Sequence, residues 1–268
     1  MDIQKELAKY KIVQDAFRDQ FFLTDEKIIR RVVGFANLNQ NDVVLEIGAG
    51  AGGLTAEIAK KAGRVIAFEI DKRFRPFLQR LPKNVEIHWE NAWKYIQLHG
   101  KFRQKREYNK IISNPPYSFI EQFLHNLTFL DYQKVILLVP LKFIRKIEEH
   151  GVFSSFFKAK IKMHIPKEKF YPIPKSNSVV IDLVKLPNPL ETKDLELFLR
   201  QYMYQHESQL VKNSLMEGII KYENLVHSKK VTKNEARKII SKKKIDKSFL
   251  ETSPRGHRIY KLITEKFG

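Results

Sequence analysis

The chain has 268 residues, of which 43% are hydrophobic and 12% aromatic, and 49 Lys and Arg against 30 Asp and Glu give a net charge of +19. This apolar content excludes a disordered chain, and 11 glycines and 11 prolines exclude a collagen-like one. The absence of cysteine excludes disulfides and cysteine-based zinc sites. The charge favours a polyanionic partner, a nucleic acid before an anionic membrane surface.

The first 140 residues alternate between helical and strand patterns. Thr24 precedes apolar residues at helical spacing between positions 28 and 36. Short apolar runs predict five strands, and helical spacing predicts the segments between them: strands at 43–47, 64–69, 85–89, 110–113 and 134–139, with helices at 54–61, 72–81 and 119–130. This order predicts an α/β fold with a parallel sheet that helices cover on both faces.

The last third of the chain changes character. Two β-rich segments, 161–165 and 178–186, flank a proline-containing loop and are expected to add strands at one edge of the sheet. Pro187 and Pro189 then predict a linker, because two close prolines end regular structure. Beyond them the pattern predicts helices at 194–205, 207–221, 232–240 and 254–266. We therefore expect two domains, residues 1–186 and a small helical domain of residues 187–268.

A glycine-rich turn, Gly48-Ala49-Gly50-Ala51-Gly52, follows the first of the five strands and opens a helix. Glycine suits a turn where the backbone bends sharply or approaches a ligand closely. Glu69 ends the next strand, where a carboxylate can accept both hydroxyls of a ribose. Glu46, just before the glycines, favours S-adenosyl-L-methionine over NAD as the cofactor, because that cofactor presents an amino-acid end instead of a pyrophosphate.

A second motif, Asn114-Pro115-Pro116-Tyr117, follows the fourth strand. An exocyclic amine is a poor nucleophile because its lone pair is delocalised into the π system. The Asn114 side-chain oxygen and the Pro115 carbonyl can accept its two hydrogens and free that lone pair, while Tyr117 can stack on the planar substrate. The motif suits adenine in DNA or RNA and glutamine in proteins, so it does not choose the substrate.

The order and spacing of five elements between residues 14 and 186 resemble the ribosomal RNA adenine dimethyltransferases of the KsgA and Erm kind. The elements are Gln20–Asp25, Leu45–Thr55, Glu69–Asp71, the Asn-Pro-Pro-Tyr motif and Phe170–Ser178. The resemblance implies a Rossmann-like methyltransferase fold with a small helical C-terminal domain. It also implies an S-adenosylmethionine-binding catalytic domain in residues 1–186 and an RNA-binding domain in residues 187–268.

The family also implies roles for single positions. The cofactor would be bound by Gln20, Leu23, Glu46, Gly48, Gly50, Glu69, Ile70, Asn91, Ala92 and Asn114. The target adenine would be held by Asn114, Pro115, Tyr117 and Phe170, with the Phe170 ring stacked on the face opposite Tyr117.

Three positions depart from the family pattern. Phe21 stands where an asparagine is typical, and Asn91 stands where an aspartate usually recognises the cofactor adenine. Pro115 fills the variable position of the catalytic motif, where leucine or isoleucine is common. An amide oxygen at position 91 can still accept hydrogens from an adenine amine, and the carbonyl at position 115 remains, so we expect activity to be retained.

Basic residues are concentrated near the C-terminus. Residues 229–247 hold nine Lys and Arg against two acidic residues, which accounts for the +7 of residues 187–268. Phosphate contacts from such a segment would make RNA binding salt-dependent. The candidate RNA-binding residues are Lys175, Lys229, Lys230, Lys242, Lys243 and Lys244.

The sequence therefore predicts an enzyme that dimethylates adenine N6 in ribosomal RNA. We expect small-subunit RNA as the target during ribosome maturation, and the large-subunit enzyme of macrolide resistance is the first alternative. A DNA adenine or protein glutamine methyltransferase and a non-catalytic nucleic-acid-binding relative are the others. We further expect a cytoplasmic monomer with no metal and no membrane segment, since neither histidine spacing for a metal site nor a long apolar run is present.

Overall fold

The computed structural model describes residues 3–13, 20–99, 107–130, 132–149, 151–187, 192–206, 209–253 and 257–268. The basic stretch 101–106 and linker residues 188–190 lie outside these ranges. The chain forms two compact units. The first comprises residues 1–144 and 159–184, and the second comprises residues 145–158 and 185–268. The second unit thus includes residues 145–158, which the sequence analysis placed in the first domain.

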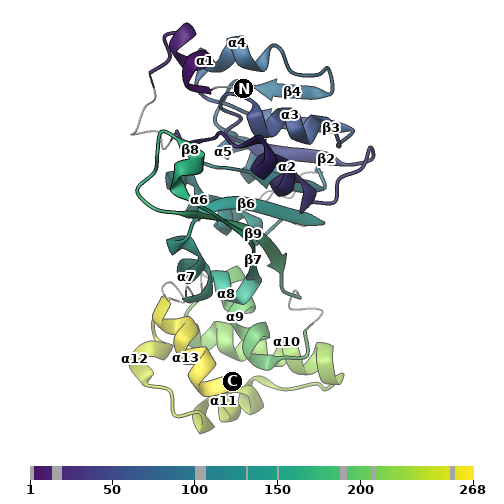
Figure 1. The fold of residues 1–268 in the computed structure, drawn as a ribbon. Coiled ribbons are helices and arrows are strands. Elements are labelled where there is room, and N and C mark those ends of the chain that lie inside the picture. The colour runs from purple at the N-terminus through teal and green to yellow at the C-terminus, as the bar shows by residue number, and fades with distance from the viewer. Residues whose placement is uncertain are drawn as a thin grey trace. The chain divides into compact units, whose positions relative to one another are not determined.

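A seven-stranded sheet forms the centre of the first unit (Figure 1). Its strands, in spatial order, are β4 (Val85–His88), β3 (Arg64–Phe68), β2 (Val43–Ile47), β5 (Lys110–Ser113), β6 (Lys134–Pro140), β9 (Ser178–Lys185) and β7 (Phe157–Ile165). The first five run parallel, and β9 pairs antiparallel with β6. The five predicted strands and the two edge strands are confirmed.

Helices cover both faces of this sheet. Alternate strand residues Val44, Val65 and Ala67 share one apolar cluster with α2 (Glu26–Gly34), α3 (Gly53–Ala59) and α4 (Arg75–Leu78). The residue following Ala67, Phe68, faces the other way and its ring lies 4.9 Å from that of Tyr95 on α5 (Ala92–His99). Helix α5 contacts α6 (Tyr117–Leu127). The α/β architecture with helices on both faces is therefore confirmed.

Several elements differ from the prediction. The expected helix 72–81 is a 3-10 turn, η2 (Lys72–Phe74), followed by the short α4, because Pro76 cannot donate to the helical ladder. Helices α1 (Ile3–Lys9), α5 and α7 (Lys142–Glu149) were not predicted. Their short segments mix apolar and charged residues and carry few capping signals.

A second, two-stranded sheet joins distant segments of the first unit. Strand β1 (Phe22–Leu23) pairs antiparallel with β8 (Phe170–Tyr171), with Leu23 opposite Phe170. The Thr24 hydroxyl and amide both donate to the Lys169 carbonyl. This pairing fixes residues 20–24 beside the proline-containing loop that follows β8, and no local pattern indicates it.

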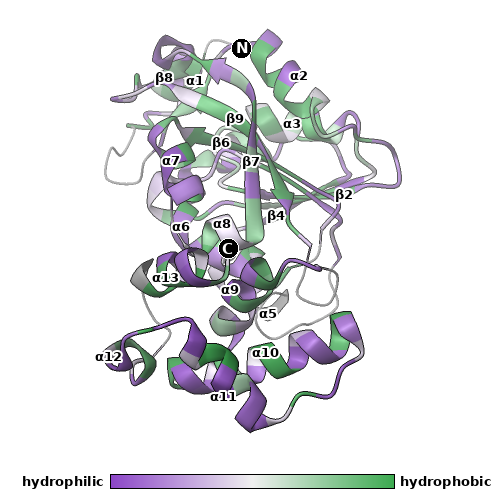
Figure 2. Ribbon diagram, turned by 90° about the horizontal axis from the view of Figure 1, so that it is seen from below, coloured by the Kyte–Doolittle hydropathy of each residue, from purple (hydrophilic) through white to green (hydrophobic). Residues whose placement is uncertain are grey.

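The second unit is helical and has its own apolar core. It contains α8 (Phe153–Phe156), α9 (Leu195–Gln205), α10 (Val211–His227), α11 (Lys233–Lys242), α12 (Lys247–Leu250) and α13 (His257–Phe267). Phe198, Met203, Leu215 and Ile263 are fully buried in this core. Figure 2 shows hydrophobic and hydrophilic residues interleaved along α10 and α11, the pattern of helices buried on one side.

Two further features concern expected absences. Within the described residues, no helix combines the length and apolarity that a membrane-spanning segment requires. Across the same parts of the chain, no three His, Asp or Glu side chains gather as a metal site.

Candidate active site

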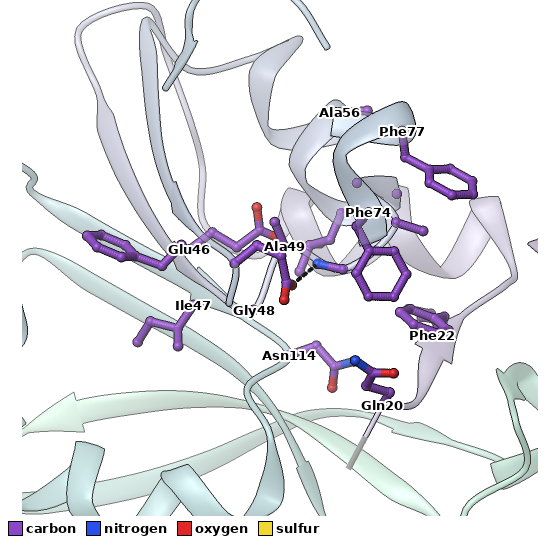
Figure 3. Close-up of a pocket in the computed structure, with 18 of the residues that line it drawn as sticks. Gln20, Phe22, Glu46, Ile47, Gly48, Ala49, Ala56, Phe74, Phe77 and Asn114 are labelled. Atoms are coloured by element: carbon purple, nitrogen blue, oxygen red, sulfur yellow. Dashed lines mark hydrogen bonds between the residues drawn. The ribbon is translucent and has the colours of Figure 1, made fainter. Parts of the chain in front are cut away.

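One cavity of about 950 Å³ lies where β2, β3, β4 and β5 end, at the carboxyl edge of the sheet (Figure 3). Ligands of parallel α/β sheets bind at this edge. The structure brings all ten predicted cofactor residues to its wall: Gln20, Leu23, Glu46, Gly48, Gly50, Glu69, Ile70, Asn91, Ala92 and Asn114. Cofactor residues predicted from positions 20 to 114 of the sequence thus all line one cavity.

The glycine turn forms one wall of the cavity. Gly48, Gly50 and Gly52 have φ angles of +79°, +55° and +79°, which residues with a Cβ rarely adopt. A Cβ on Gly50 would lie 2.8 Å from Cε1 of Phe22, so this position also excludes a side chain by contact. The Gly50 amide donates to Oε2 of Glu69 at 2.7 Å, which ties the turn to the end of β3.

Glu69 is held from both sides. Its Oε1 accepts a hydrogen bond from the Asp71 amide at 2.7 Å, while Oε2 accepts from Gly50. The residue is 7% exposed, and this burial raises the pKa of its carboxyl, which the two backbone donors oppose. Each oxygen keeps a lone pair, so the fixed carboxylate can still accept a hydroxyl from a ligand.

Glu46 has the most unusual environment of the site. It is 1% exposed, and among the described residues its Oε2 has no hydrogen-bond partner. Burial raises the pKa of Glu46 to about 8, the Thr55 side chain opposes this rise in part, and the nearby charge of Glu69 adds to it. A buried acceptor without a partner in a cavity wall is well suited to a cationic or hydrogen-bond-donating ligand group.

Gln20 is anchored to the loop after β3. Its Nε2 donates to Oδ2 of Asp71 at 3.0 Å. The Arg73 side chain donates to both oxygens of the same carboxylate and to the Val13 carbonyl. These cationic hydrogen bonds lower the pKa of Asp71 to about 2. Sequence reasoning quoted Asp71 within a motif but missed this role, which only tertiary contacts reveal.

Asn114 is oriented by the N-terminal segment. Its Nδ2 donates to the Phe21 carbonyl at 2.9 Å, which fixes the side-chain amide and leaves Oδ1 as the acceptor. Asn114, Gln20 and Gly48 all line the cavity, and Figure 3 labels all three. The structure therefore presents at the cavity the acceptor that the sequence analysis required of Asn114.

The other three residues predicted to hold the target base do not line the cavity. Pro115 is buried, and the ring of Tyr117 stacks on that of Phe21 with centroids 5.5 Å apart. Phe170 is 2% exposed, because the β1–β8 pairing places its ring in the apolar core. The structure places Phe170 in the core instead of at the cavity, and the stacking roles of Phe170 and Tyr117 stay predictions.

The side-chain oxygen of Asn91, which was expected to bind the cofactor adenine, has a partner within the protein. Its Oδ1 accepts a hydrogen bond from the Trp93 amide at 2.9 Å, at the start of α5. The oxygen assigned to the cofactor adenine is thus already bonded to the helix. Ala92, the first residue of α5, is buried beside it at the cavity wall.

The predicted RNA-binding lysines fall into two groups. In the second unit Lys229, Lys230, Lys242 and Lys244 are exposed, whereas Lys243 is half-buried with Nζ 5.0 Å from the centroid of the Phe267 ring. Lys175 is exposed in the first unit, in the loop that follows β8. The five exposed side chains can reach a phosphate backbone, while Lys243 also serves packing.

Comparison with known proteins was consistent with this architecture. A family model described as ribosomal RNA adenine dimethylase matches residues 15–254. A probable ribosomal RNA small subunit methyltransferase A of Pyrococcus furiosus is 30% identical, over 97% of this chain and 92% of that protein. The ribosomal RNA small subunit methyltransferase A of Thermotoga neapolitana is also 30% identical, over 92% and 97% respectively.

Two solved structures share the fold. The dimethyladenosine transferase of Plasmodium falciparum superposes with a TM-score of 0.58 and 17% identity, over 92% of this chain and 97% of that one. The 23S rRNA methyltransferase ErmE superposes with a TM-score of 0.55 and 19% identity, over 92% and 99%. Because the family model covers most of the sequence and relatives that are 30% identical span more than nine-tenths of it, the chain belongs to the ribosomal RNA adenine dimethylase family of methyltransferases.

Proposed function

We propose that this protein transfers methyl groups from S-adenosyl-L-methionine to the N6 amine of adenine in small-subunit ribosomal RNA. The observation that carries the proposal is the convergence of Asn114, Glu69 and the glycine turn on one cavity. Family membership and the names of the 30% identical relatives supply the substrate class and the choice of subunit. The family description supports the transfer of two methyl groups to one adenine, and we propose adjacent adenines as the targets.

The cavity wall suits this cofactor. When bound, S-adenosyl-L-methionine supplies a methyl group activated by a positively charged sulfonium. The buried carboxyl of Glu46, whose Oε2 has no partner in the described part of the chain, matches the ammonium of its amino-acid end. Glu69 offers carboxylate oxygens to the ribose, and Ile70, 60% exposed at the wall, offers an apolar surface for the cofactor adenine.

Asn91 fits the adenine of the cofactor by its amide hydrogens instead of its oxygen. Because Oδ1 is bonded to the Trp93 amide, the NH2 group is the part left to meet a ring nitrogen. This arrangement replaces the acceptor role expected from the sequence with a donor role, and we propose that Asn91 recognises the ring on that basis.

The target amine would be positioned by Asn114. Its Oδ1 accepts one N–H hydrogen, and the Pro115 carbonyl is proposed to accept the other, which directs the nitrogen lone pair toward the methyl group. The Phe21 carbonyl keeps the Asn114 amide from rotating, since Nδ2 of Asn114 donates a hydrogen bond to it. An acceptor fixed in this way needs no reorientation during the reaction.

RNA would be held by the exposed lysines of both units. We propose Lys229, Lys230, Lys242 and Lys244, with Lys243 beside them, as phosphate contacts of the helical unit, and Lys175 as one of the catalytic unit. Such contacts would use part of the protein's net charge of +19.

The proposal is tested with radiolabelled S-adenosyl-L-methionine and three acceptors: small subunits that lack the modification, large subunits and duplex DNA. We expect label in the small subunit alone and primer-extension stops at two adjacent adenines. Label in large subunits would favour the resistance-type target. Label only in DNA, or in none of the three, would reject ribosomal RNA methylation.

A further inference from the structure

We propose that the edge strand β7 carries a further contact for the RNA backbone, formed by Lys160, Lys162 and Lys167 (the β7 strip). All three lysines belong to the first unit. The inference rests on the proposed function, because ribosomal RNA is the polyanion which that function names. It adds a binding surface that lies outside the cavity and outside the helical unit.

The first argument is the alternation of side chains along β7. Lys160 and Lys162 are exposed. The residues that alternate with them face the protein, since Ala159 and Ile165 are buried and Met163 packs against the apolar core. Residues two apart in a strand project on the same side, about 6.6 Å from each other. Because β7 is the last strand of the sheet, these two ammonium groups stand at the rim of the sheet.

The second argument is that the charges of the β7 strip are not neutralised. Among the described residues, none of its three lysines forms an ion pair with an Asp or Glu, whereas other lysines of the same sheet do. Lys110 of β5 is paired with Asp42 at 2.9 Å. Lys134 of β6 is paired with Asp182 of β9 at 2.6 Å. The β7 strip therefore keeps its positive charge for an external anion.

The third argument is how Lys162 is held. Its Nζ lies 5.5 Å from the centroid of the Phe35 ring, at the C-terminal end of α2. An aromatic face attracts a cation but does not cancel its charge. The Lys162 side chain is thus placed along the surface and keeps its three N–H donors for a phosphate.

The fourth argument is where the β7 strip leads. The Lys167 amide donates to Oδ1 of Asn177 at 3.0 Å, and the Leu141 amide donates to the carbonyl of Asn177 at 3.1 Å. These bonds tie the end of β7 to the end of β6, the strand whose Leu138 lines the cavity. Lys175 stands two residues before Asn177 in the sequence. An RNA strand that follows β7 would therefore approach the cavity past the contact already proposed for this unit.

Edge lysines can also have a different role, which the test must separate. Charged side chains on an edge strand hinder its pairing with another chain, and either sign of charge serves this purpose. A phosphate contact requires positive charge. Residues 159–175 hold five lysines against one acid, Glu168, so the charge of this segment has one sign. Charge reversal distinguishes the two roles, because a glutamate still protects the edge but repels phosphate.

The salt dependence of RNA binding tests the inference. Filter binding of radiolabelled small-subunit ribosomal RNA is measured between about 50 and 200 mM salt. In the double variant Lys160→Gln, Lys162→Gln, the slope of log Kobs against log salt should fall by about 1.4 to 1.8, since each phosphate contact contributes about 0.7 to 0.9. The matched control is Lys83→Gln, an exposed lysine before β4 at the opposite edge of the sheet, which should keep the wild-type slope.

Charge reversal gives the second readout. Lys160→Glu should weaken RNA binding more than Lys160→Gln does. Lys83→Glu changes the net charge by the same amount and should bind RNA as the wild type does. In all these variants the dissociation constant of S-adenosylhomocysteine and the urea midpoint should match the wild-type values, because the lysines are exposed and do not line the cavity.

Three results would overturn the inference. These are an unchanged slope in the double variant, equal losses of RNA affinity in Lys160→Glu and Lys83→Glu, and a reduced slope with duplex DNA but not with ribosomal RNA. If the double variant shows the reduced slope but the wild type transfers no label to small subunits, the proposed function fails while the RNA contact at β7 stands.

Discussion

At the scale of single residues, the site combines two acidic groups with different surroundings. Glu69 has a backbone donor on each oxygen, whereas the buried Oε2 of Glu46 has none among the described residues. The same burial therefore costs Glu46 more when it is ionised. The residues next to Glu46 in the sequence do not indicate this cost of ionisation, because the sheet and its covering helices determine how deeply the end of β2 is buried.

This difference predicts a pH dependence of stability. The Glu46 carboxyl titrates near pH 4.3 in an unfolded chain and has a pKa of about 8 in the fold. The folded state thus binds the proton more tightly, and the free energy of unfolding falls as the pH rises from about 4 to about 8. The glutamine in Glu46→Gln cannot ionise, so the free energy of unfolding of the ligand-free variant should not fall in this way. Above pH 8 it should exceed the wild-type value by a few kcal/mol, at about 1.4 kcal/mol per pKa unit.

Urea unfolding of the ligand-free protein between pH 5 and pH 9 checks this prediction, with the exposed Glu168→Gln as the matched control. The control should follow the wild type throughout. If the free energy of unfolding varied with pH in the same way for the wild type and Glu46→Gln, Glu46 would be ionised at neutral pH. That result would refute its raised pKa.

Asn114→Ala gives a second prediction at this scale. The variant removes the acceptor proposed for the target amine, and transfer should fall by at least about 100-fold, as for loss of a preorganised polar group. The cofactor retains Glu69 and the glycine turn, so we expect binding of S-adenosylhomocysteine within several-fold of the wild type. Isothermal titration calorimetry and label transfer measure the two quantities, and full turnover would contradict the role.

At the scale of elements, the sequence predicted the sheet but not the connections that complete the site. The five parallel strands and the glycine turn follow from local patterns, because buried strands are short apolar runs and positive φ angles favour glycine. The β1–β8 pairing, the anchor of Gln20 on Asp71 and the burial of Phe170 involve residues 51 to 149 positions apart. No local periodicity encodes such contacts.

The glycine turn supplies a prediction about an element. Gly50→Ala places a Cβ 2.8 Å from the Phe22 ring at a φ of +55°, so we expect a loss of about 1–3 kcal/mol in stability and weaker cofactor binding. Gly34→Ala is the matched control, because a Cβ there meets nothing within 4 Å and alanine favours the helix. Chemical unfolding measures the stability of the two variants, and calorimetry measures their cofactor affinity. Equal values for Gly50→Ala and Gly34→Ala would argue against a constrained turn.

At the scale of the whole molecule, the fold consists of two units with separate cores and separate sets of charges. The predicted boundary near residue 187 lies close to the last crossing between units, at residues 184 and 185. The sequence analysis did not indicate that residues 145–158 join the helical unit, since their apolar residues look the same in either core. We propose that the helical unit contributes RNA affinity and the α/β unit contributes chemistry.

Replacement of Lys229, Lys230, Lys242 and Lys244 by alanine tests this division. Each lost phosphate contact should reduce the slope of log Kobs against log salt by about 0.7 to 0.9, while cofactor binding stays unchanged. Lys261→Ala, an exposed lysine of α13, is the control. Fluorescence anisotropy with ribosomal RNA fragments between 50 and 200 mM salt gives the slopes, and an unchanged slope would exclude this segment from the interface.

The central claim is that the protein dimethylates adenine in small-subunit ribosomal RNA at the cavity that Asn114 lines. Nucleoside mass spectrometry of RNA from small subunits that lack the modification, after incubation with the protein and S-adenosyl-L-methionine, tests it most directly. We predict N6,N6-dimethyladenosine with the wild-type protein and none with Asn114→Ala. No methylated adenosine with the wild type, or an equal amount with the variant, would contradict the account.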